Sequence, residues 1–156
     1  MQDIFLGLGQ HAPQQVSLRA VLIGLGVVWA AMLIVLLVGW QPGTYLALEL
    51  VWALPPILLQ IWFGLDILVR HRRLVLLTIV PATLYLSAAD HLAISLGVWT
   101  INPEQSLGLF LGTHLPIEEF VFFLLTTVLV TFGLVLALAS ESWERIRGQT
   151  LVGSRD

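Results

Sequence analysis

Four long runs of apolar residues constrain this chain more than any other feature of its sequence. They cover about residues 18–38, 44–68, 74–98 and 117–140. A helix needs about 20 mostly apolar residues to cross the roughly 30 Å hydrocarbon layer of a bilayer. Each run is long enough, and the pattern predicts an all-α, integral membrane helical bundle with four transmembrane helices.

The composition excludes several classes of protein. Of the 156 residues, 58% are hydrophobic and only 11% are charged, against roughly 25% charged residues in soluble domains. The absence of cysteine excludes disulfides and thiolate chemistry. The net charge of −3 has the wrong sign for nucleic-acid binding. No dinucleotide fingerprint or P-loop is present, and the histidines lack metal-ligand spacing, so we expect no cofactor and no metal.

The order of the apolar runs predicts how the chain is organised. The first run is too long and starts too late for a cleaved signal peptide, so we expect a retained helix. The prediction is an N-terminal segment over 1–17, an extra transmembrane helix over 18–38, a three-helix domain over 44–140 and a polar tail over 141–156. The loop over 99–116 is long enough to cover a site.

The arginines predict the orientation in the membrane. All seven lie before the first run, between the second and third runs, or after the fourth. With four crossings these places share one side, and positive residues favour the cytoplasmic side. We therefore expect a multi-pass protein of the cell inner (plasma) membrane with both termini in the cytoplasm. The turn at Pro42 and the loop over 99–116 then face outward.

Acidic residues inside membrane segments are costly and are candidates for function. Asp66 lies near the arginine-bearing end, and we expect it to pair with Arg70 four residues later. The other four are placed in the outer half of the membrane by three different helices, with Asp90 about 12 Å deep. These four are Glu49, Asp90, Glu118 and Glu119.

Structural explanations exist for each of these residues. A glutamate after Pro116 can stabilise a helix N-terminus, and Glu49 can reach up to the interface. Asp90 can bond to Ser87 or to a neighbouring helix. Aromatic residues beside the glutamates can face lipid or stabilise a transient cation, and histidines can be ordinary polar contacts. The side chains in question are Phe120, Phe122, Phe123, His91 and His114.

In order along the chain, these residues resemble a known family. The run over 45–138 is similar to the small integral-membrane lycopene cyclase domain, found in bacterial two-subunit cyclases and as two fused copies in archaeal and fungal enzymes. The likeness rests on Pro55-Pro56, the basic turn before Leu74, Asp90, Gly97-Val98-Trp99, Asn102-Pro103-Glu104, and Pro116-Ile117-Glu118-Glu119 followed by Phe122-Phe123. The first apolar run lies outside the matching stretch, and only one copy of the motif set is present.

The resemblance implies redox-neutral, proton-initiated cyclisation of the ψ end of a long-chain carotenoid in the membrane. The implied enzyme is an intramolecular lyase or isomerase that needs no cofactor and acts as a homodimer or with a homologous subunit. The expected catalytic residues are Glu118, Glu119 and Asp90, with Glu49 as a lesser member. The expected substrate-binding residues are Phe120, Phe122, Phe123, Trp99, Asn102, Pro116 and His91.

Two other functions remain open from the sequence. A small proton-linked transporter would use the same acids, although the inner halves of the apolar runs are nearly all aliphatic, which argues against a polar pathway. A non-catalytic subunit that binds a carotenoid or a partner helix is the other alternative. Loss of activity on carboxylate substitution separates an enzyme from such a subunit.

The arginine pattern gives the first testable prediction. Topology reporters fused after Trp40 and after Gln105 should lie outside, and reporters fused after Arg73 and after Gly148 should lie in the cytoplasm. Reporter activity in membranes checks this assignment. A cytoplasmic signal from the fusion at Gln105 would contradict it.

Overall fold

The chain forms five α-helices and a short hairpin within the residues that the structure describes. The structure is a computed structural model that describes residues 17–153, with side chains described up to residue 147. The predicted N-terminal segment lies outside this range except for Ser17. The elements are α1 (Leu18–Val38), η1 (Gln41–Gly43), α2 (Thr44–Arg70), α3 (Arg72–Ser95), η2 (Pro103–Gln105), β1 (Phe110–Leu111), β2 (Leu115–Pro116), α4 (Ile117–Leu138) and α5 (Ser140–Gly153).

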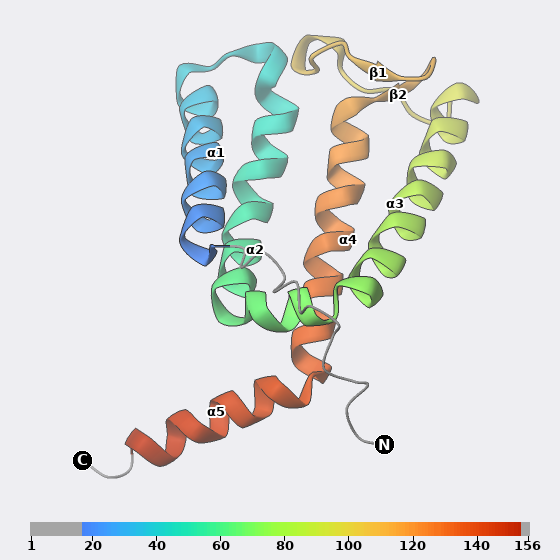
Figure 1. The fold of residues 1–156 in the computed structure, drawn as a ribbon. Coiled ribbons are helices and arrows are strands. Elements are labelled where there is room, and N and C mark those ends of the chain that lie inside the picture. Colours follow the sequence, from blue (N-terminus) through green and yellow to red (C-terminus); the bar gives the residue numbers. More distant parts are fainter. Residues whose placement is uncertain (1–16, 154–156) are drawn as a thin grey trace, which may run out of the picture.

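Four long helices stand side by side in a row rather than around a central core (Figure 1). Helix α2 packs on α1 and α4, and α4 packs on α3, whereas α2 and α3 contact each other little. The row order is therefore α1, α2, α4, α3. The antiparallel hairpin pairs Phe110 with Pro116 and Leu111 with Leu115 at the end where α4 begins.

The four helices confirm the predicted all-α class with four spans. α1, α3, α4 and the stretch of η1 with α2 are each long and apolar enough to cross a membrane. Large apolar side chains are exposed along them, as lipid-facing surfaces require. Within the row, buried Ala53, Ile57 and Ile61 of α2 pack against α1 and α4.

Two predicted helix ends are shifted, for local reasons. The third run was expected to continue to residue 98, but α3 ends at Ser95 because Gly97 adopts a left-handed φ of 70°. The amide of Gly97 then bonds to the carbonyl of Ile94, which caps the helix. The fourth run was expected to reach residue 140, but Ala139 is extended and starts a new direction.

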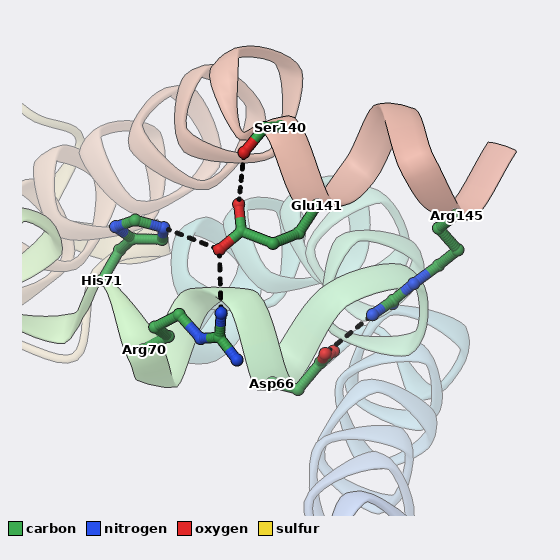
Figure 2. A network of polar contacts seen from close by, with 6 residues as sticks. All are labelled: Asp66, Arg70, His71, Ser140, Glu141 and Arg145. Carbon is green, nitrogen blue, oxygen red and sulfur yellow. Dashed lines mark hydrogen bonds and ion pairs between the residues drawn. The ribbon is translucent and has the colours of Figure 1, made fainter. Parts of the chain in front are cut away.

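The predicted polar tail contains a helix, α5, which runs away across the arginine-bearing end of the row (Figure 1). This helix overturns the predicted pairing of Asp66 with Arg70. Asp66 instead bonds to Arg145 of α5 at 2.7 Å, and Arg70 pairs with Glu141 at 3.2 Å, as Figure 2 shows.

The backbone of α2 is bent close to the residues that contact Arg145. Gly64 has non-helical angles, and an added Cβ there would collide with Cδ2 of Leu136 on α4. The helix therefore bends just before Asp66. The carbonyl of Phe63 accepts a hydrogen bond from Arg145, whose guanidinium also lies 5.6 Å from the centre of the Phe63 ring. The same arginine thus binds the bend and the carboxylate.

A row of buried hydroxyl groups lines the contact between α3 and α4. Thr83 and Thr127 share a hydrogen bond of 2.8 Å across the two helices. Ser87 and Thr131 are buried nearby on the same helices. Small and hydroxyl-bearing residues allow close helix packing in membranes, so these groups hold α3 against α4.

The hydroxyl pair yields a stability prediction. Thr83→Val should lower the free energy of unfolding by about 0.6–1.7 kcal/mol, the range for hydrogen bonds between membrane helices. Thr127 keeps its bonds to the carbonyls of Phe123 and Leu124, so no new polar group is stranded. Thr126→Val is the matched control, because the buried Thr126 hydroxyl forms no hydrogen bond in the part of the chain that the structure describes. Denaturant titration in detergent measures the free energy of unfolding of both variants. Equal values for Thr83→Val and Thr126→Val would refute the role of the pair.

Candidate active site

Four carboxyl groups from three helices meet at the end of the row that the hairpin covers. Glu49 comes from α2, Asp90 from α3, and Glu118 and Glu119 from the first turn of α4. Their exposed fractions are 7% for Glu49, 2% for Asp90 and 1% for Glu118, and Glu119 is partly buried. Glu119 lies close enough to interact electrostatically with the other three. It is therefore the centre of the group.

Glu118 is bound to the loop that precedes it. Its Oε1 atom accepts hydrogen bonds from the Ser106 hydroxyl at 3.1 Å and from the Leu107 amide at 2.6 Å. The Ser106 hydroxyl also accepts a bond from the Gly108 amide. Glu118 thereby fastens the loop over 99–116 to the start of α4. Its other oxygen, Oε2, is buried with no hydrogen-bond partner among the described residues.

Glu119 and Glu49 line one cavity between α2 and α4. The cavity has a volume of about 290 Å³, and its other lining side chains are Tyr45, Leu48, Trp52 and Phe122. Glu49 has a buried oxygen, Oε2, that no described residue hydrogen-bonds. The two glutamates therefore share a pocket whose remaining walls are mainly aromatic and aliphatic.

Asp90 is buried on α3, on the other side of α4 from Glu49. Neither oxygen forms a hydrogen bond of normal geometry with a described residue, although the Trp99 indole approaches it. The suggested bond to Ser87 is wrong, since the Ser87 hydroxyl also forms no hydrogen bond within residues 17–153. Its interaction with Glu119 connects Asp90 to the cavity side of the group.

The aromatic residues beside the glutamates divide into two sets. Phe122 lines the cavity, and its ring lies 6.5 Å from that of Trp52 and 5.5 Å from that of Phe123. Phe120 and Phe123 are partly buried on α4 but are not among the residues that line this cavity. Phe122 is thus the predicted aromatic residue that the structure brings to Glu49 and Glu119.

The other predicted binding residues lie in the loop that covers the site, except His91, which lies on α3. Asn102 accepts a bond from the Glu104 amide and begins η2, and Pro116 precedes α4 and pairs with Phe110. His91 packs edge-on against His114 with ring centres 5.4 Å apart. A second cavity of about 390 Å³ lies under this loop and includes His114 and Pro116. These residues shape the cover.

Sequence reasoning missed three contributors to the site. Tyr45 and Trp52 lie four residues before and three residues after Glu49, so helical spacing places them on the same face of α2. That signal was available. Nothing in the sequence connects Ser106 with Glu118, because the chain between them forms the hairpin. In the described part of the chain, no group of three His, Asp or Glu side chains could hold a metal ion.

Curated proteins with related sequences have lycopene cyclase in their names. The chain is 35% identical over 136 residues to a bifunctional lycopene cyclase/phytoene synthase of Podospora anserina, covering 85% of this chain and 23% of that protein. A protein of the same name from Leptosphaeria maculans is 44% identical over 96 residues, or 58% of this chain and 16% of the relative. A lycopene beta-cyclase of Halobacterium salinarum is 41% identical over 93 residues, which cover 59% of this chain and 38% of that protein.

The chain therefore spans between 16% and 38% of the length of these relatives. No family model matches the chain, and no solved structure matches it. The match to the Podospora anserina protein nevertheless covers 85% of this chain, and the names agree with the likeness seen in the sequence. The chain belongs to the same family as these fungal and archaeal lycopene cyclases.

Proposed function

We propose that this protein is a carotenoid end-group cyclase, or one subunit of such an enzyme, that uses its carboxyl groups for proton transfer. The observation that carries the proposal is the cavity in which Glu49 and Glu119 face aromatic walls. The names of the relatives supply the substrate class, a lycopene-like polyene.

The proposed reaction moves protons and leaves the oxidation state unchanged. The O–H of a neutral carboxylic acid adds its proton to the terminal double bond, which leaves a carboxylate and a tertiary cation. The next alkene supplies its π electrons to form the ring C–C bond, and the positive charge moves to the carbon left behind. A carboxylate then removes a proton from a neighbouring carbon, and those C–H electrons form the new double bond. The product is an isomer of the substrate.

The geometry favours different roles for the acids. Two close, buried carboxyl groups do not readily ionise together, so a pair such as Glu49 and Glu119 retains a proton. We assign the proton donor to Glu119, because it lines the cavity and interacts with all three other acids. Glu49 and Asp90 are the candidate bases. Glu118 braces the loop, and the π faces of Trp52 and Phe122 stabilise the cation.

A second subunit completes the proposed enzyme. A cavity of about 290 Å³ accommodates an end group rather than a whole polyene. The helix row packs in one layer and leaves its broad faces without protein cover among the described residues (Figure 1). We propose that a second copy or a homologous subunit lies against the row and encloses the rest of the substrate. The arginine pattern supports a plasma-membrane protein whose cavity faces outward.

The buried hydroxyl row favours one alternative. Thr83, Ser87 and Thr127 lie below Asp90 along the α3–α4 contact, so the interior of the row is less aliphatic than the sequence pattern indicates. A proton-linked transporter would use such groups as a path. Reconstituted vesicles separate the two functions. Proton flux without cyclisation of lycopene would favour transport.

Substitutions that keep shape and remove proton transfer test the assignment. In a lycopene-producing host that also carries a homologous partner, Glu119→Gln and Asp90→Asn should each lower ring formation on the order of 10²-fold or more. Glu144→Gln and Asp66→Asn are matched controls at the other end of the row and should keep most activity. Pigment analysis, normalised to the amount of protein in the membrane, gives the result.

The proposed acid–base site would be wrong if Glu118→Gln, Glu119→Gln and Asp90→Asn all kept near-normal ring formation. Loss of ring formation in the two control variants as well would point to folding rather than chemistry.

The bracing role of Glu118 has its own test. Glu118→Ala removes the side chain that accepts the hydrogen bond of the Leu107 amide, so hydrogen exchange at that amide should speed up by roughly tenfold. Ser106→Ala should speed up exchange at the Gly108 amide, because this amide donates a hydrogen bond to the Ser106 hydroxyl. Ser95→Ala is the control, since that hydroxyl bonds within α3. Unchanged exchange in both loop variants would rule out the brace.

A further inference from the structure

The turn between α2 and α3 carries positive charge that nothing in the described chain neutralises. Arg70, Arg72 and Arg73 lie within four residues. Arg70 pairs with Glu141, and Arg145 pairs with Asp66. No described acid pairs with Arg72 or Arg73. Two positive charges therefore remain at an exposed turn beside the ends of three helices.

A hollow and a groove meet at this turn. The hollow has a volume of about 410 Å³ and is lined by the three arginines together with His71 and Leu74. The groove has a volume of about 270 Å³ and lies between α3 and α4, where Leu134, Val135 and Leu138 form its apolar wall. His71 and Leu74 line both. The basic hollow and the apolar groove are thus neighbours that share two lining residues.

We propose that this composite site binds an anionic phospholipid, with the phosphate at Arg72 and Arg73 and one acyl chain in the groove between α3 and α4. Guanidinium groups bind phosphate oxygens through paired, charge-assisted hydrogen bonds. Basic pockets between membrane helices at the headgroup level are suited to anionic lipids. A free phosphate would use the hollow but would leave the apolar groove empty.

The neighbouring acidic group does not compete for the two arginines. Glu141 lies 3.2 Å from Arg70 and 3.6 Å from His71, and Figure 2 shows these contacts together. Its own backbone hydrogen bond lowers the pKa of the Glu141 carboxyl group, and His71 and Arg70 act in the same direction. Glu141 therefore stays ionised and held by Arg70 and His71, and Arg72 and Arg73 face the lipid.

The lipid site is independent of the proposed cyclase chemistry, since it lies at the opposite end of the row from Glu119. Lipid binding is measured by native mass spectrometry of the full chain in mild detergent. The sample contains equal amounts of dioleoyl phosphatidylglycerol and dioleoyl phosphatidylcholine. The wild-type chain should retain one phosphatidylglycerol in preference to phosphatidylcholine. Arg72→Gln with Arg73→Gln should weaken that preference roughly tenfold or more. Arg19→Gln, at the same end but on α1, should leave it unchanged.

The groove is tested with the charges intact. Thr78 lines the groove, so Thr78→Phe should fill it and weaken phosphatidylglycerol binding, whereas Thr78→Val should not. Thermal unfolding confirms that each variant is folded.

Three results would overturn the proposal. Equal binding of the two lipids by the wild-type chain excludes an anionic site. Equal effects of Arg19→Gln and the double variant mean that the attraction comes from overall charge. Full competition by glycerol 3-phosphate, with no effect of Thr78→Phe, means that the hollow binds phosphate alone.

Discussion

Glu49, Asp90 and Glu118 are each less than one tenth exposed, although a carboxylate near the centre of a bilayer costs roughly 2.5–3.5 kcal/mol. The rest of the structure depends on how the chain accommodates these groups. One oxygen of Glu118 accepts hydrogen bonds from the loop, from the Ser106 hydroxyl and the Leu107 amide. The other two acids lie where they interact electrostatically with Glu119 of α4. The chain thus gathers its buried carboxyl groups at one end of the row.

Helix α4 determines how these groups come together. It packs between α2 and α3 in the row, so its first turn can present Glu119 toward Glu49 and interact with Asp90 behind it. At its other end, Ala139 turns the chain into α5, which binds the bent part of α2 through Arg145. Helix α4 therefore positions the acids at one end of the row and leads into the contacts of Arg145 with Phe63 and Asp66 at the other.

The sequence was enough to predict the helices, because apolar length and arginine placement are properties of single segments. It also predicted that Asp90 and the two glutamates share one end, since alternating helix direction follows from the short turns. It did not predict Arg145 as the partner of Asp66, because that pairing depends on the direction of α5, which begins after the extended Ala139. Nor could it separate Glu118 from Glu119, since the difference arises from a loop contact twelve residues away.

Isotope incorporation tests the central claim most directly, because a proton-initiated ring closure must take its first proton from a group that exchanges with water. Membranes that contain this chain, alone or with a homologous subunit, are supplied with lycopene in D₂O. They should yield a cyclised product that carries one deuterium per ring formed. Mass spectrometry of the extracted carotenoid measures the gain. Rings formed without deuterium, or no cyclised product with either a second copy or a homologous subunit, would contradict the account.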